Sequence, residues 1–117
     1  MELTAIHHPI AERELQHSDG RIIRVVIGRP EPFPGDESFF CPFRIIGLAG
    51  DKVRYAGGTD AVQALTLAQR MIGALLYTSD AYRAGQLTWE GGSVYGDLGF
   101  PVPDNLRDLP PKGAAYF

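Results

Sequence analysis

The sequence contains few of the residues that mark several classes of protein. Its one cysteine, Cys41, excludes an intramolecular disulfide and a zinc site built from the cysteines of a single chain. No segment approaches the roughly 18 consecutive apolar residues of a membrane-spanning helix. Residues 1–6 also lack the basic region and the apolar run of a secretory signal. We therefore expect a cytoplasmic protein that does not bind a membrane.

Positive charge is scarce as well. The only lysines are Lys52 and Lys112, the arginines are scattered, and the net charge is −3. Because a nucleic-acid-binding surface needs a cluster of basic residues, we expect no nucleic acid as a partner. The hydrophobic content of 44% over 117 residues is ordinary for one globular domain. We predict a single domain over residues 1–117, with its core at about 10–103 and a frayed tail at 104–117.

Four segments have the residue pattern of strands. The pattern is clearest over 21–28, where β-branched residues fill both faces. Asp19-Gly20 supplies the positive φ that a tight hairpin needs, so this strand should pair with the one before it. Pro42 predicts an edge position or a bulge in the third strand, because proline donates no backbone hydrogen bond. The predicted strands are residues 10–16, 21–28, 38–47 and 52–56, connected as an antiparallel meander.

A long helix follows the strands. Gly57-Gly58 ends the last strand, Thr59 or Asp60 caps the helix, and Gln63 has the spacing of a capping box. The helix runs to residues 76–77, and its apolar arc is wider than the roughly 100° that a helix buries against one layer. A second element should therefore cover it. The core stripe predicted at helical spacing is Val62, Leu65, Ala68, Ile72, Leu75 and Leu76.

These segments predict an α+β fold: an antiparallel sheet of about four strands (a meander), one long helix packed on one face, and an extended Gly/Pro-rich C-terminal tail. Residues 87–89 are predicted as a short fifth strand, with 94–95 pairing back. Residues 99–103 should lie across the core, and 105–109 should add a helical turn. The second face of the sheet is too apolar to be simply solvated. We expect this face, or the wide helix, to contact a partner, in a homodimer or with another protein.

The glycine pair before the helix is the first candidate for chemistry. Backbone N–H groups at a helix start can hold an anion. The lysine of a phosphate-binding loop is missing, however, and the carboxylate of Asp60 already lies at the positive end of the helix. A tight turn with a cap is therefore the better interpretation of Gly57-Gly58.

Metal and nucleophile chemistry are not predicted either. His7, His8 and His17 could act as ligands together with a strand glutamate, Glu12 or Glu14. Adjacent histidines on a strand point to opposite faces, so solvated histidines are the better interpretation. Cys41 should be a small buried hydrophobic residue. We predict no catalytic residue, no metal and no cofactor.

Four arginines fall on predicted strands: Arg13, Arg24, Arg44 and Arg54. If they share one face of the sheet, they form a patch for an acidic ligand or partner. If they do not, they are ordinary solvated strand residues. The sequence leaves both interpretations open.

The order of several short motifs resembles a known family. The motifs are Cys41–Gly47, Ala56–Leu65, Leu87-Thr88-Trp89 and Asp97–Pro101. Together they resemble a family of small bacterial proteins known only as a domain of unknown function, over about residues 10–103. The resemblance implies a compact, stand-alone bacterial domain and brings no known activity or catalytic residue.

These observations favour a non-enzymatic protein-binding or assembly module. The alternative is a small-ligand-binding protein or an enzyme with a pocket near the N-terminus of the helix. Its ligand-binding residues would then be Tyr55, Asp60, Gln63 and Trp89.

Overall fold

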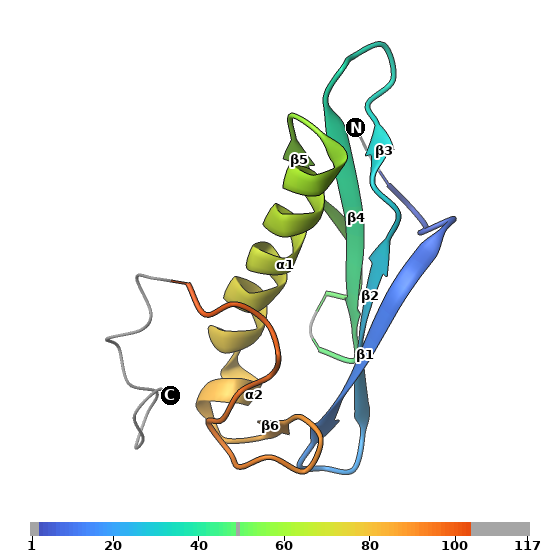
Figure 1. Cartoon of the computed structure of the whole chain (residues 1–117). Helices are drawn as coiled ribbons and strands as arrows, with labels where there is room; N and C mark the ends of the chain where they lie inside the picture. Colours follow the sequence, from blue (N-terminus) through green and yellow to red (C-terminus); the bar gives the residue numbers. More distant parts are fainter. Residues whose placement is uncertain (1–2, 49, 104–117) are drawn as a thin grey trace.

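The computed structural model describes residues 3–48 and 50–103 as one antiparallel sheet with a long helix on one face (Figure 1). The α+β class and the long helix are therefore confirmed. The predicted frayed tail at 104–117 and helical turn at 105–109 lie outside the described residues. The strands are β1 (Pro9–His17), β2 (Ile22–Gly28), β3 (Glu31–Pro32), β4 (Phe39–Ile46), β5 (Val53–Gly58) and β6 (Leu87–Thr88), and the helices are α1 (Ala61–Tyr77) and α2 (Asp80–Arg83).

The four long strands form the predicted meander. β2 pairs with β1 and with β4, and β4 pairs with β5, always antiparallel. Two short strands extend this sheet: β3 lies beside the start of β4, and β6 pairs with Gln16 and His17 at the end of β1. The expected fifth strand is therefore present as β6, but 94–95 does not form a strand that pairs with it.

The prediction that Pro42 marks an edge or a bulge is confirmed, because the pairing of β4 is interrupted beside this residue and its register shifts by one residue there. On one side Pro42 lies opposite Tyr55 of β5. On the other side, β2 pairs with β4 only as far as Phe43, and β3 begins to pair only at Phe40. Pro42 thus falls in the gap between two short partners, where the missing N–H leaves no hydrogen bond unmade.

The predicted end of β5 also changes. The strand continues through Gly57 and Gly58, which pair with Phe40 and Phe39. A side chain at Gly58 would collide with the backbone of Ala64 in the first turn of α1. The glycine therefore serves a close approach of strand and helix, in addition to leading into the turn.

The core lies between α1 and the face of the sheet that we call the inner face. Its buried strand residues alternate along the chain, as the period of a strand requires. On α1, the buried side chains recur every four residues. The prediction that Val62 belongs to the core stripe of this helix is wrong, because Val62 is 73% exposed. The fully buried residues include Leu15, Ile23, Val25, Cys41, Phe43, Ala64, Ala68, Ile72 and Leu76.

The expected second cover of α1 is the chain's own tail. The segment 97–103 crosses the helix, with Leu98 and Phe100 buried in the core (Figure 1). At the crossing, the Pro101 carbonyl oxygen occupies the place of a side chain on Gly73. A glycine in mid-helix is unfavourable by itself, so this contact explains why one stands there.

Tyr77, the last residue of α1, fixes the tail to the helix. Its buried hydroxyl accepts a hydrogen bond from the Leu98 N–H at 3.0 Å and lies 3.1 Å from the Phe100 carbonyl oxygen. The Asp97 carboxylate is 3.3 Å away. Burial raises the pKa of Tyr77 to about 12, against its ordinary value of 10.

Gly73→Ala should destabilise the protein, although alanine is the better helix former. The new methyl group must displace Pro101, and overpacking of this kind costs about 1–3 kcal/mol. Thermal unfolding followed by circular dichroism measures the change. Thr66→Ala, at an exposed position of the same helix, is the matched control and should be neutral or slightly stabilising. A Gly73→Ala protein as stable as Thr66→Ala would contradict the tail crossing.

Tyr77→Phe should lower the free energy of unfolding by about 1–3 kcal/mol near neutral pH, because it leaves the buried Leu98 N–H without its acceptor. The raised pKa adds a pH dependence: the native state keeps the phenolic proton that the unfolded state loses. This contribution is complete below pH 10 and disappears as the pH rises towards 12. Urea titrations at several alkaline pH values should therefore show the difference between wild type and Tyr77→Phe shrinking. A constant difference would contradict the burial of this hydroxyl.

Candidate functional site

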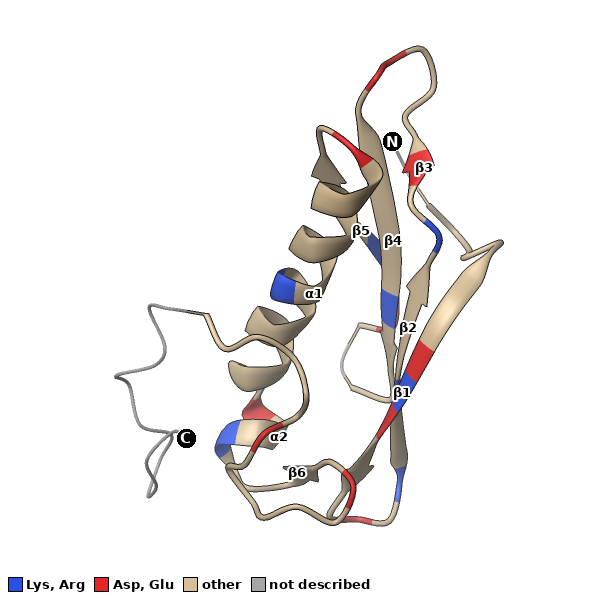
Figure 2. Cartoon of the chain, viewed as in Figure 1, with Lys and Arg blue, Asp and Glu red and all other residues tan. Residues whose placement is uncertain are grey.

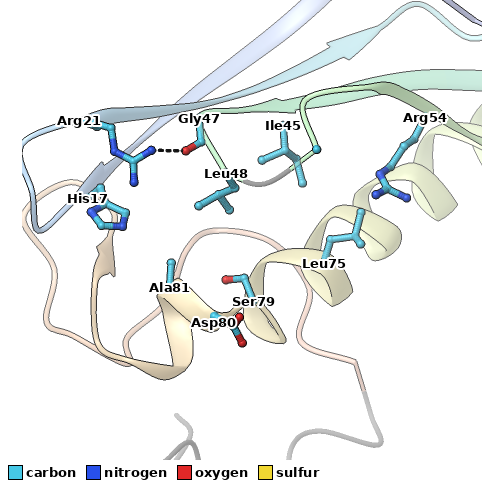
Figure 3. Close-up of a pocket in the computed structure, with 11 residues that line it drawn as sticks. His17, Arg21, Ile45, Gly47, Leu48, Arg54, Leu75, Ser79, Asp80 and Ala81 are labelled. Carbon is cyan, nitrogen blue, oxygen red and sulfur yellow. Dashed lines mark hydrogen bonds between the residues drawn. The ribbon is translucent and has the colours of Figure 1, made fainter.

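The largest described cavity lies where the sheet extends past the end of α1, and we call it the junction pocket. It is formed by four regions: the β1–β2 hairpin, the end of β4 with the residues after it, β5, and the α1–α2 junction (Figure 3). Its volume of about 620 Å³ is within the range of small-molecule sites. Ile45, Leu48, Leu75 and Ala81 provide an apolar lining.

Two polar residues of the junction pocket are already engaged. Arg21 donates from Nε to Asp19 at 2.7 Å and from Nη1 to the Gly47 carbonyl oxygen at 2.6 Å. A hydrogen bond from the Arg21 backbone N–H holds the pKa of Asp19 below its ordinary value, so this ion pair persists at neutral pH. Ser79 donates to the Leu76 carbonyl oxygen and accepts from the Tyr82 N–H, which caps α2.

Two charged residues of the junction pocket are not engaged. Within residues 3–48 and 50–103, neither the Arg54 guanidinium nor the Asp80 carboxylate has a hydrogen-bond or ion-pair partner. Arg54 projects from β5 towards Leu75, and Asp80 lies on the opposite wall at the start of α2 (Figure 3). A half-buried arginine beside an apolar lining has the chemistry to bind an anionic group.

The structure places only two of the four predicted ligand residues together. Asp60 caps α1 by accepting from the Gln63 N–H at 2.8 Å, and the Gln63 side chain accepts from the Thr59 N–H at 2.6 Å. The predicted cap is confirmed, and both side chains are used by it.

The other two predicted ligand residues lie elsewhere. Tyr55 is on the sheet face away from α1, where its ring meets Phe33 and Phe40 edge-on. Trp89 lies beyond β6, with the Arg13 guanidinium 4.1 Å from its ring centre. No described cavity unites the four residues, and the largest one is at the C-terminal end of α1. Ligand binding by these side chains stays a prediction.

The four strand arginines do not form one patch. Arg13 and Arg54 lie on the inner face, whereas Arg24 and Arg44 lie on the opposite face, which we call the outer face. Arg13 donates to the Gly99 carbonyl oxygen at 2.6 Å and stacks between aromatic rings, so it holds the tail. Successive side chains of a strand point to opposite faces of the sheet. This alternation places two of the four arginines on each face.

The outer face has a covered end and an uncovered end. At the covered end, Phe33 packs on Phe40, and the side chains of Ile6 and Pro42 lie over Gly28. At the uncovered end, no described segment forms a second layer over the sheet. The apolar side chain of Ile22 is therefore 44% exposed there. The half-buried apolar residues of this end are Val26, Ile46 and Val53.

Charge on the outer face is divided between its two sides, as Figure 2 shows for the strands. Glu12 and Glu14 on β1 share one guanidinium, that of Arg24, at 3.1 and 3.7 Å. Arg44 on β4 donates to the Asp51 carbonyl oxygen and has no carboxylate partner among the described residues. The β1 side therefore has an excess negative charge and the β4 side an excess positive charge.

The histidines and Cys41 are not gathered into a metal site in the part of the chain that the structure describes. His17 turns its Nδ1 to the Asp19 N–H at 3.1 Å, on the face opposite Glu12 and Glu14. Among the described residues, no three histidine, cysteine, aspartate or glutamate side chains are close enough to hold a metal ion. Cys41 is fully buried, as predicted, and burial raises its pKa to about 11.

No local sequence motif predicts the junction pocket. Its lining residues come from four regions between residues 17 and 81, and none of those regions is unusual by itself. One sequence signal bears on the pocket: α1 ends at Tyr77, and Ser79 can cap a second helix. Together they predict that the chain changes direction at this point.

The fold defines a class: an α+β domain with one antiparallel sheet, a single long helix packed on it, and a segment, 97–103, that crosses the helix. The chain matches the family of a domain of unknown function (DUF6968) over residues 11–102 and belongs to that family. No curated protein and no solved structure shows a significant similarity to the chain. Within the described part, neither helix has the length and apolar content needed to cross a bilayer.

The buried state of Cys41 can be checked chemically. Ellman's reagent should react with native protein at pH 8 at least about a hundredfold more slowly than with urea-unfolded protein, since both exposure and thiolate formation are suppressed. The rate of colour formation in the two conditions measures this. Rapid reaction of the native protein would contradict the burial of Cys41.

Proposed function

We propose that this protein is a non-enzymatic assembly module that forms a twofold homodimer through the uncovered end of the outer face. The observation that carries the proposal is an apolar strip on this face that no segment of residues 3–48 and 50–103 covers. Antiparallel sheets are stable with one solvated face when that face is polar. Here Ile22, Val26, Ile46 and Val53 form an apolar strip among the charged residues of that face, and Ile22 is 44% exposed.

The register of the strands supports a second copy as the partner. Glu12, Val26 and Arg44 lie in one row across β1, β2 and β4. A twofold axis that runs along β2 between two facing sheets stacks Val26 on Val26 of the second copy. The same axis places each Glu12 over Arg44 of the other copy, twice per dimer. The face is thus complementary to itself in charge, as an isologous interface requires.

The neighbouring rows fit this arrangement. Ile22 stacks on Ile22 of the second copy, which covers the most exposed apolar residue of the face. Arg24 lies opposite Arg24 of the second copy, but the charge of each guanidinium is balanced by Glu12 and Glu14 of its own chain. Two sheets that face each other in this way form a sandwich with a spacing of about 10 Å.

The roles of the two most strongly perturbed groups favour binding over catalysis. Perturbed pKa values often mark active sites. Among the described residues these groups are Cys41, which is enclosed in the core, and Tyr77, whose hydroxyl holds the tail. Both serve the stability of the fold.

The charge pattern allows a specific test. Arg44→Glu and Glu12→Arg should each weaken self-association by about tenfold or more, because each places like charges opposite one another twice. A mixture of the two variants should recover the dimer, since both contacts of the mixed pair are again of opposite sign. Sedimentation velocity at tens of micromolar protein gives the masses, and circular dichroism checks that each variant is folded.

Arg70→Glu is the matched control. Arg70 is exposed on α1, on the other side of the molecule, and its reversal should leave the dimer unchanged. A monomeric wild-type protein at tens of micromolar would overturn the proposal. A dimer that survives Arg44→Glu and Glu12→Arg as well as it survives Arg70→Glu would overturn the proposed interface.

A further inference from the structure

The junction pocket is a second site, on the inner side of the sheet and independent of the proposed dimer face. We propose that it binds a small organic monocarboxylate with an aliphatic body, and that Arg54 is the residue that recognises the carboxylate. Three features support this assignment: the size of the pocket, its apolar lining, and two charges that have no partner within residues 3–48 and 50–103.

The shape of the pocket limits the ligand to a small molecule. Its volume is about 620 Å³, and it is bounded by sheet on one side and by the α1–α2 junction on the other (Figure 3). Leu48 projects into it from the sheet side, next to Ile45, and Leu75 lines it from α1. These aliphatic side chains contact an apolar ligand body and offer no hydrogen bond to a sugar-like one.

The charges determine which end group the ligand carries. Every other arginine on the strands has a hydrogen-bond acceptor within the protein, whereas Arg54 has none among the described residues. Its guanidinium is half-buried beside Leu75, where a carboxylate can accept two parallel hydrogen bonds in a partly desolvated setting. Arg21, at the other end, is already bound to Asp19 and Gly47, so Arg54 is the available anion partner.

Asp80 makes the site selective for a single negative charge. Asp80 stands on the α2 wall of the same pocket, where its side chain is exposed and has no partner among the described residues. A second carboxylate at the far end of a ligand would be brought towards this charge. A neutral or cationic end group would not be repelled, so monocarboxylates and ω-amino carboxylates are preferred over dicarboxylates.

Titration of ¹⁵N-labelled protein with sodium hexanoate tests the proposal. We expect binding with a dissociation constant of about 1 mM, typical for a probe with so few non-hydrogen atoms. The amide signals of Gly47, Leu48, Ser79 and Ala81 should shift most. Hexylamine should bind more weakly than hexanoate, and so should adipate, because of Asp80.

Arg54→Gln should weaken hexanoate binding by about tenfold, the effect expected for a charge-assisted hydrogen-bond pair. Arg83→Gln is the matched control, because it removes the same charge from an exposed arginine outside the pocket. Circular dichroism confirms that both variants fold. Shifts confined to other parts of the protein, hexylamine binding as tightly as hexanoate, or equal losses in the two variants would each overturn the proposal. None of these results depends on whether the protein is a dimer, which sedimentation measures separately.

Discussion

The crossing of the tail over α1 is the constraint on which the rest of the structure depends. α1 carries a single charged residue, Arg70, and its apolar arc is too wide for the sheet alone (Figure 2). The helix packs against β4 and β5. Leu98 and Phe100 join the core beside it, and Gly73 lets Pro101 pass close to the helix backbone. Tyr77 then fixes the crossing with a buried hydroxyl.

The packing of the tail on α1 determines which surfaces remain available for binding. The tail covers part of α1 and leaves Val62 and Met71 exposed, and a further apolar surface without a cover in the described chain lies on the outer face of the sheet. The helix ends at Tyr77, before the end of the sheet, and the short turn of α2 leaves the junction pocket between them. The junction pocket thus results from the point at which α1 ends. The uncovered outer face results from the tail packing on α1, on the inner side of the sheet.

Sequence patterns predicted the local structure well and the assembled sites poorly. The meander, the cap at Asp60 and the burial of Cys41 follow from turn chemistry, spacing and parity, which are properties of neighbouring residues. The missing N–H of Pro42 predicts an irregularity in the sheet, whereas its place between the ends of β2 and β3 depends on tertiary pairing. Tyr55, Asp60, Gln63 and Trp89 were grouped by type, and only the packing of strands and helix could show that they lie apart. The junction pocket is made by segments far apart in the chain, so no local signal marks it.

The position of Trp89 has a spectroscopic consequence. It is the only tryptophan of the chain, and the Arg13 guanidinium lies over its ring while also donating to the tail at Gly99. Phe100 flanks the same guanidinium from the tail. Release of the tail would remove this cation from the indole and open its surroundings to water. The emission of Trp89 is therefore a built-in optical reporter of whether the tail is docked, with no label attached to the protein.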